Sequence, residues 1–194
     1  MGTLDQNTVA EFIATMDQDL CGLSMTRSEF FQSMYQVDKD LAIGAIHEAG
    51  HCVAAWAFDF PILEMSIDEF RQDLDGFRNM SSAYEVSADR LNNQRERTKY
   101  LMAVIAMAGI MAERRISGTL DDAAFEGDAE KAMKHIGKYF TNETVGEVML
   151  ENMFDEVDEI LDDHWDKVEM LAIAAYKFGP VLDGPIVKEI IDRS

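Results

Sequence analysis

Residues 41–58 read LAIGAIHEAGHCVAAWAF, an apolar stretch interrupted by the HExxH motif of residues 47–51. If residues 40–57 form a helix, His47 and His51 lie four residues apart on one face, so both imidazoles can reach one metal ion. Glu48 then lies beside that metal without ligating it, an arrangement typical of zinc hydrolases in which a carboxylate takes the proton of a metal-bound water. Burying these polar groups on an apolar helix would be costly unless a divalent metal compensated them.

A small β-hairpin is predicted directly after this helix. Leu63, Met65 and Ile67 alternate with polar residues, which is the pattern of a half-buried strand over residues 62–68. A turn at Asp75-Gly76 and renewed alternation from Met80 predict the partner strand.

The rest of the chain is predicted to be helical, so the expected fold class is mainly α with this one β-ribbon. Thr8 and Thr26 each precede a glutamate by three residues, which is capping-box spacing, and Asp38 or Asp40 could cap the HExxH helix. Thr119–Gly127 is expected to be an acidic loop that ends where Asp128 begins a helix. The predicted helices and amphipathic regions are 8–20, 27–37, 40–57, 88–116, 128–139, 144–177 and the segment that Asp183 and Pro185 open.

Composition narrows the function classes. The 194 residues carry a formal net charge of −20, which argues against binding a nucleic-acid backbone or an anionic membrane. The longest apolar run, residues 101–112, is too short to span a bilayer, and the N-terminus lacks the basic region of a signal peptide, so we expect no membrane insertion and a cytoplasmic location. Cys21 and Cys52 have no paired spacing, which fits a reducing compartment.

A catalytic zinc usually has three protein ligands, so the motif needs one more donor downstream. The residues after His51 carry no third histidine at the extended metzincin spacing. Spacing leaves four candidates open: Glu113, Asp128, His135 and His164. Glu113 could instead pair with its neighbouring arginines, and Asp128 could instead cap its helix.

Four segments, in order, resemble the C-terminal peptidase domain of the FtsH family of ATP-dependent zinc metalloproteases. They are AIHEAGHCVAAW (45–56), AMAGIMAERRISG (106–118), GDAEKAM (127–133) and VLDGPIVKEII (181–191). The resemblance runs from about Ser28 to the C-terminus. It implies a zinc peptidase domain over residues 28–194, preceded by a helical extension over residues 1–27.

The resemblance also implies roles for individual residues. His47, His51 and Asp128 would be the zinc ligands, Glu48 the general base, and Glu113 a structural group packed behind the site. The predicted ribbon would lie near the cleft, where an extended substrate could add as a strand.

The resemblance implies a zinc metalloendopeptidase that hydrolyses unfolded or short polypeptides, with Zn²⁺ as its cofactor. Family members carry an ATPase module, but this sequence contains no GxxxxGK[ST] P-loop. Folded substrates are therefore not expected, and a separate ATPase partner or a homo-oligomer is left open. The alternative function is a catalytically inactive relative that acts as a binding or adaptor module.

Overall fold

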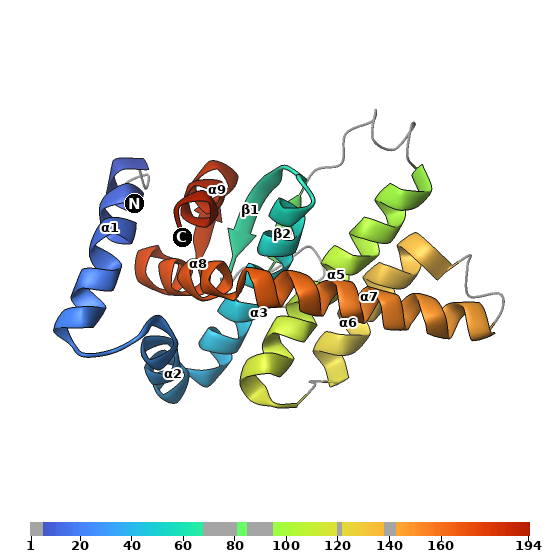
Figure 1. The fold of residues 1–194 in the computed structure, drawn as a ribbon, viewed down its shortest axis with the longest axis horizontal. Coiled ribbons are helices and arrows are strands. Elements are labelled where there is room, and N and C mark those ends of the chain that lie inside the picture. Colours follow the sequence, from blue (N-terminus) through green and yellow to red (C-terminus); the bar gives the residue numbers. More distant parts are fainter. Residues whose placement is uncertain (1–5, 68–80, 85–94, 120–121, 138–142) are drawn as a thin grey trace.

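The computed structural model describes residues 6–67, 81–84, 95–119, 122–137 and 143–194 (Figure 1). It is mainly helical with a small antiparallel sheet, which confirms the predicted fold class. The elements are α1 (Gln6–Gly22), α2 (Arg27–Val37), α3 (Lys39–Ala57), β1 (Ile62–Ser66), β2 (Ser81–Tyr84), α5 (Arg95–Ser117), α6 (Asp122–Ile136), α7 (Glu143–Asp163), α8 (Trp165–Phe178), β3 (Val181–Asp183) and α9 (Gly184–Arg193).

The HExxH motif lies on α3, a helix whose ends match the prediction closely. Of the two predicted caps, Asp38 is the N-cap, and its carboxylate accepts a hydrogen bond from the Leu41 N–H at 3.2 Å. The preceding helix, α2, begins with the predicted capping box between Thr26 and Glu29. The helix predicted over residues 8–20 is present as α1, but it begins at Gln6, so Thr8 lies inside it and is not its N-cap.

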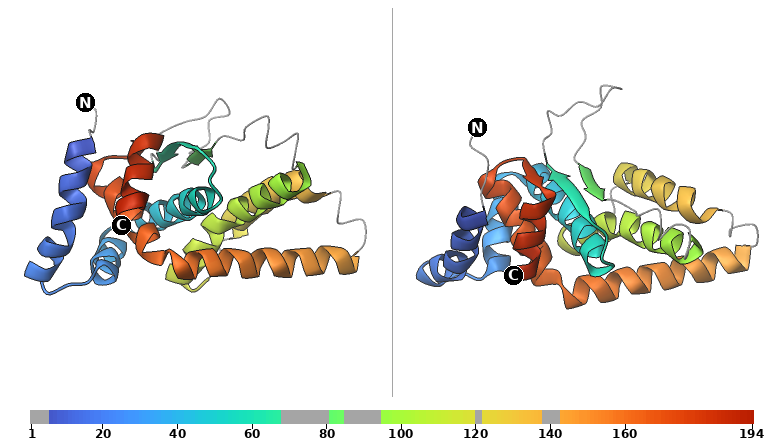
Figure 2. Two further views of the ribbon diagram at one scale, coloured as in Figure 1. Left: turned by 45° about the horizontal axis from the view of Figure 1, so that its top comes forward. Right: turned by 90° about the horizontal axis from the view of Figure 1, so that it is seen from above.

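Small residues let α3 and α5 approach closely. A Cβ placed on Gly50 would lie 2.7 Å from the Ala108 carbonyl oxygen and 2.8 Å from the Ala112 Cβ. Glycine is therefore required where the two helices pack. Helix α5 packs against both α3 and α6 (Figure 2), which brings α6 to the helix that carries the motif.

The predicted hairpin is present, and a third strand joins it. The strand order is β2-β1-β3, with β1 antiparallel to both neighbours. Met65 of β1 lies opposite Ser82 of β2 and Leu182 of β3. The predicted turn at residues 75–76 lies outside the described residues, as do Met80 and Val86. The sheet packs on α3 and α9.

Helix α6 begins earlier than predicted. Its first residue is Asp122, so the expected loop is helical from that point and Asp128 lies inside the helix rather than at its start. A glycine such as Gly127 costs a helix only about 1 kcal/mol relative to alanine. The residues before it are good helix formers, so the helix continues through this position. The last turn of α5 carries Arg114 and Arg115 before Gly118, as expected. The predicted first turns of that helix, residues 88–94, lie outside the described part.

The amphipathic region after Glu143 forms two helices, α7 and α8, with His164 between them. The two helices run along one side of the molecule (Figures 1 and 2). Arg115 connects α5 to both helices. It forms ion pairs with Asp158 at 3.1 Å and Asp162 at 2.8 Å on α7, and it lies over the Trp165 ring of α8.

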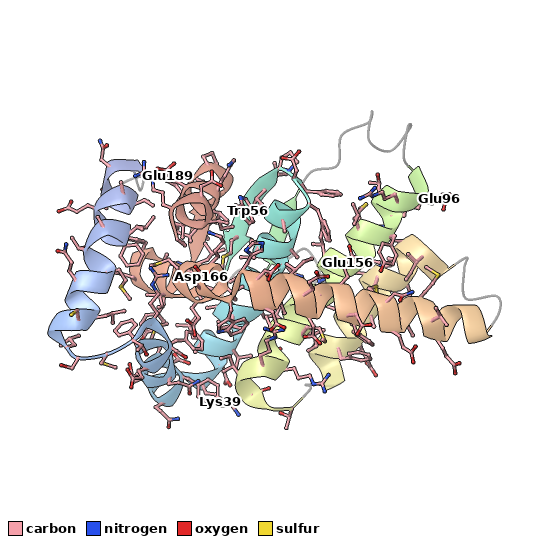
Figure 3. The ribbon with its side chains drawn as sticks, viewed as in Figure 1. Lys39, Trp56, Glu96, Glu156, Asp166 and Glu189 are labelled. Atoms are coloured by element: carbon pink, nitrogen blue, oxygen red, sulfur yellow. The ribbon has the colours of Figure 1, made fainter. Side chains whose placement is uncertain are left out.

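The remaining helices close the core. Trp56 at the end of α3 donates a hydrogen bond from Nε1 to the Asp192 carboxylate of α9 at 2.8 Å (Figure 3). Helix α1 packs on α9 and contributes Val9, Phe12 and Met16 to the same buried cluster as the rest. The boundary proposed after residue 27 stays a prediction. Among the residues that the structure describes, no helix combines the length and apolarity that crossing a membrane requires.

Candidate metal centre

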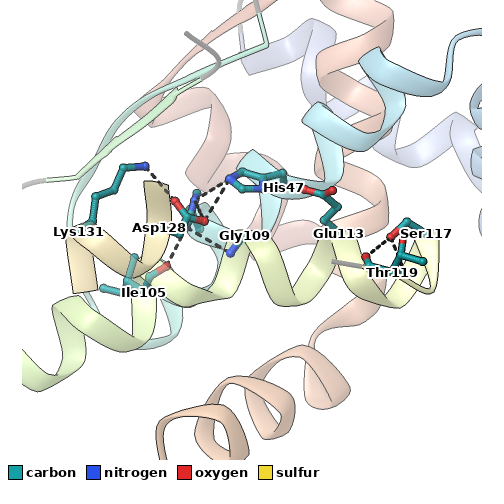
Figure 4. A network of polar contacts seen from close by, with 9 residues as sticks. His47, Ile105, Gly109, Glu113, Ser117, Thr119, Asp128 and Lys131 are labelled. Atoms are coloured by element: carbon teal, nitrogen blue, oxygen red, sulfur yellow. Dashed lines mark hydrogen bonds and ion pairs between the residues drawn. The ribbon is translucent and has the colours of Figure 1, made fainter. Parts of the chain in front are cut away.

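Three side chains from two helices converge on one point. His47 and His51 of α3 face each other with their Nε2 atoms 3.2 Å apart. Asp128 of α6 places its Oδ2 atom 3.3 Å from the His47 Nε2 and 3.4 Å from the His51 Nε2 (Figure 4). Within the described ranges, these three residues are the single group of histidine, cysteine or acidic side chains placed to hold a metal ion.

Helix α5 fixes how both imidazoles point. The His51 Nδ1 lies 2.7 Å from the Ile105 carbonyl oxygen, and the His47 Nδ1 lies 3.3 Å from the Glu113 Oε2. Both partners are acceptors and favour a proton on each Nδ1; at His51 the Ile105 carbonyl at 2.7 Å is closer than the Gly109 N–H, which lies 3.3 Å from the same Nδ1. The Nε2 lone pairs are then free and directed at the shared point. Outer-shell partners of this kind orient metal-binding histidines.

Gly109 lies between these two partners on α5 and makes room for the imidazoles. A Cβ on this residue would lie 2.4 Å from the His51 Nε2 and 2.8 Å from the His47 Nε2. Ile105, Gly109 and Glu113 are spaced by four residues, so one stripe of α5 supplies an acceptor, a space and a second acceptor.

One of the convergent atoms, the Asp128 Oδ2, lacks a hydrogen-bond partner among the described residues. Neither contact of the Asp128 Oδ2 with an imidazole has hydrogen-bond geometry, and this buried atom has no hydrogen-bond partner in the described structure. Asp128 is 2% exposed and His51 is 5% exposed. Two lone pairs and a carboxylate oxygen this close repel one another unless a proton or a metal ion lies between them.

Burial and neighbouring charges shift the pKa values of Asp128 and His51. Burial acts to raise the pKa of Asp128, but His51, His47 and Lys131 outweigh it and hold that pKa well below its usual range. Burial acts to lower the pKa of His51, but the nearby Asp128 carboxylate, with the charge of Glu48, outweighs it and raises that pKa. The centre therefore favours a positive charge between Asp128 and His51.

Glu48 lies next to the convergent group on α3. It is 4% exposed, and its Oε2 atom has no hydrogen-bond partner among the described residues. A buried carboxylate oxygen left without a donor is costly, so this atom is placed to accept a proton or a hydrogen bond from a further group.

The other candidate ligands lie elsewhere. Glu113 contacts the Nδ1 of His47, on the side of the ring away from the convergent atoms. His135 is in the last turn of α6, and His164 packs edge-on against Trp56. None of the three belongs to the convergent group.

Gly109 and the Ile105 carbonyl were not singled out from the sequence. A backbone carbonyl leaves no mark in the sequence, and a glycine in a helix does not reveal what it faces. Asp128 could have been placed by helical spacing, because it shares a buried face of α6 with Ala132 and Ile136, four and eight residues further along. A carboxylate on an otherwise apolar face is the detectable signal.

No protein-family model matches this chain, and no curated protein matches it either.

Proposed function

We propose that the chain is a zinc-dependent metalloendopeptidase that hydrolyses unfolded or short polypeptides. One observation carries this proposal: two imidazole Nε2 atoms and the buried, unpartnered Asp128 Oδ2 converge beside Glu48, whose Oε2 also lacks a hydrogen-bond partner among the described residues. A binding site with no chemistry to perform has little use for a second buried carboxylate that does not join the ligands.

The distances between the donors favour a tetrahedral ion such as zinc over an octahedral one. Ligands about 2.05 Å from a tetrahedral zinc are about 3.3 Å from one another. Neighbouring ligands of an octahedral ion at about 2.1 Å would be only about 3.0 Å apart. The three separations are 3.2, 3.3 and 3.4 Å, so the triangle fits tetrahedral zinc better.

His47, His51 and Asp128 would hold the metal and leave one coordination position open. A zinc ion bound there would acidify a water molecule and polarise the scissile carbonyl. Glu48 would accept the water proton and later donate it to the leaving amine, which is the role of a general acid–base group. Glu113 and the Ile105 carbonyl would keep both histidines in the Nδ1-protonated form that leaves Nε2 free.

The burial of the group supports a flexible polypeptide substrate. The His47 side chain is 13% exposed, against 6% for His51 and 2% for Asp128, so the group is approached from the His47 side. A buried group of this kind is easier for an extended chain to reach than for a folded protein surface. Strand β2 is at one end of the strand order, where an extended peptide could add by backbone hydrogen bonds.

Glu48→Gln tests the assigned chemistry. The variant should bind zinc as the wild type does, since Glu48 is not a ligand, but its hydrolysis of an unfolded casein-like protein should fall about 10²–10⁴-fold. Glu130→Gln is the matched control, because this glutamate is exposed on α6 and pairs with Lys134. Turnover that persists in Glu48→Gln would remove Glu48 from the mechanism. A zinc-loaded wild type without any hydrolysis would instead favour the binding or adaptor module.

A further inference from the structure

The two oxygens of the Asp128 carboxylate have different partners. Oδ2 faces the two imidazoles, whereas Oδ1 accepts a hydrogen bond from the Lys131 Nζ at 3.0 Å. Figure 4 shows the lysine reaching the carboxylate from the side opposite His47. The side chain of Asp128 is 2% exposed and that of Lys131 is 62% exposed, so a surface lysine ends on a buried oxygen beside the metal centre.

The backbone of α6 sets this contact. The two residues are three apart in one helix, which places their side chains on neighbouring positions of the same face. The ion pair is therefore local to α6 and joins no other element. The ion pair therefore acts on the Asp128 carboxylate, and stabilising the packing between helices does not explain it.

We propose that Lys131 is a positioning residue that reserves Oδ1, so that Asp128 offers the metal a single oxygen. A carboxylate can bind a metal through one oxygen or through both. If Oδ1 were free, it could rotate toward the metal and fill the coordination position that substrate needs. With the ammonium bound to Oδ1, only Oδ2 faces the histidines, and the ligand set stays at three.

Charge balance leads to the same assignment. Three carboxylates lie near the two histidines: Asp128 and Glu48 beside the convergent atoms, and Glu113 behind the His47 ring. Lys131 offsets one of their charges, which leaves two to balance a divalent ion. A positive charge this close to the metal also repels it, so Lys131 limits how tightly the centre holds zinc while it keeps one position open.

The proposal rests on the zinc site proposed above, and its test does not require hydrolysis. Co²⁺ is loaded into the wild type, Lys131→Met and Lys131→Arg. The visible absorption of Co²⁺ weakens when a fourth protein donor raises its coordination number from four to five. Zinc affinity is measured in parallel by competition with a chromophoric chelator. Lys134→Met is the control, because it removes an exposed lysine one turn further along α6 that pairs with Glu130.

We expect Lys131→Met to absorb less strongly with Co²⁺ and to bind zinc on the order of tenfold more tightly. Lys131→Arg, which keeps a donor for Oδ1, and Lys134→Met should both resemble the wild type. A Lys131→Met variant with the wild-type spectrum, or with weaker zinc binding, would overturn the positioning role. Wild-type protein that binds neither ion would refute the proposed metal site itself, and one that binds without hydrolysing peptides would refute only the enzymatic function.

Discussion

Two regions of the molecule bury carboxylates, and they treat them differently. Glu169 on α8 is 6% exposed, and its carboxylate accepts hydrogen bonds from the Trp165 Nε1 at 3.1 Å and from Ser28. Glu48 and Asp128 at the metal centre are as well buried, yet each has one oxygen without a hydrogen-bond partner in the described structure.

The contrast separates a structural carboxylate from a functional one. Where α8 packs against α2, the protein supplies the donors itself, so the buried charge is satisfied within the fold. At the candidate metal centre, the nearby groups are hydrogen-bond acceptors or, like Lys131, already bond another atom. One oxygen of each carboxylate is therefore available to a cation or a substrate. The unsatisfied oxygens, more than the motif alone, support the function proposed for this site.

The largest effect should come from filling the space at the metal centre. Gly109→Ala would place a methyl group 2.4 Å from the His51 Nε2, so we expect zinc binding to be lost and the free energy of unfolding to fall by about 1–3 kcal/mol. Gly127→Ala is the matched control on α6, where nothing lies within 4 Å of the added Cβ. It should raise stability by about 0.5–1 kcal/mol and leave zinc binding unchanged.

Thermal unfolding and zinc stoichiometry of both glycine variants check this prediction. Full zinc binding by Gly109→Ala would show that the imidazoles can move away from α5. The two imidazoles would then not be held rigidly by α5.

An intermediate effect is expected from Glu113, the acceptor behind His47. Glu113→Gln keeps a hydrogen-bond acceptor for the His47 Nδ1 but removes the charge, so zinc affinity should fall about 10–100-fold. Chelator competition measures it beside Asp128→Ala, which should lose more. Complete loss of zinc in Glu113→Gln with retention in Asp128→Ala would make Glu113 the third ligand.

The smallest effect belongs to the satisfied carboxylate. Burial raises the pKa of Glu169 above its usual value of 4.5, although Ser28, Trp165 and Arg27 partly offset this. The folded state therefore binds its proton more tightly than the unfolded state, and its contribution to stability is lost as pH rises through the folded pKa. Glu169→Gln mimics the protonated form and should be more stable than the wild type at pH 7, by about 1 kcal/mol or less, and equal to it near pH 3.

Denaturant unfolding at the two pH values tests this difference. A variant that is less stable at pH 7 would mean that the charge itself is needed beside Ser28 and Trp165. The contrast between the two regions would then weaken.

Local sequence signals predicted much of the fold. The extent of α3, its cap at Asp38, the capping box at Thr26 and the strand after Pro61 all follow from spacing over a few residues. Strand β3 was missed because it is three residues long and is defined by pairing with β1, which is distant in the sequence. The start of α6 was placed six residues late, at Asp128 instead of Asp122, because the acidic segment before Asp128 was interpreted as a loop.

The candidate site was predicted in part. The histidines and Glu48 followed from the motif, and helical spacing alone could not choose between Glu113 and Asp128, since that choice depends on how α5 and α6 pack on α3. The packing puts Glu113 behind the His47 ring and Asp128 in front of both rings. Gly109 and the Ile105 carbonyl could not be predicted from the sequence, because their roles depend on the imidazoles of α3 that lie against them.

Anomalous diffraction at the zinc edge, from crystals of the zinc-loaded protein, tests the central claim most directly. We expect one peak about 2.0–2.2 Å from the His47 Nε2, the His51 Nε2 and the Asp128 Oδ2, with the Glu113 carboxylate outside ligand distance. The absence of a peak at this position, or a peak ligated by Glu113 instead of Asp128, would contradict the account.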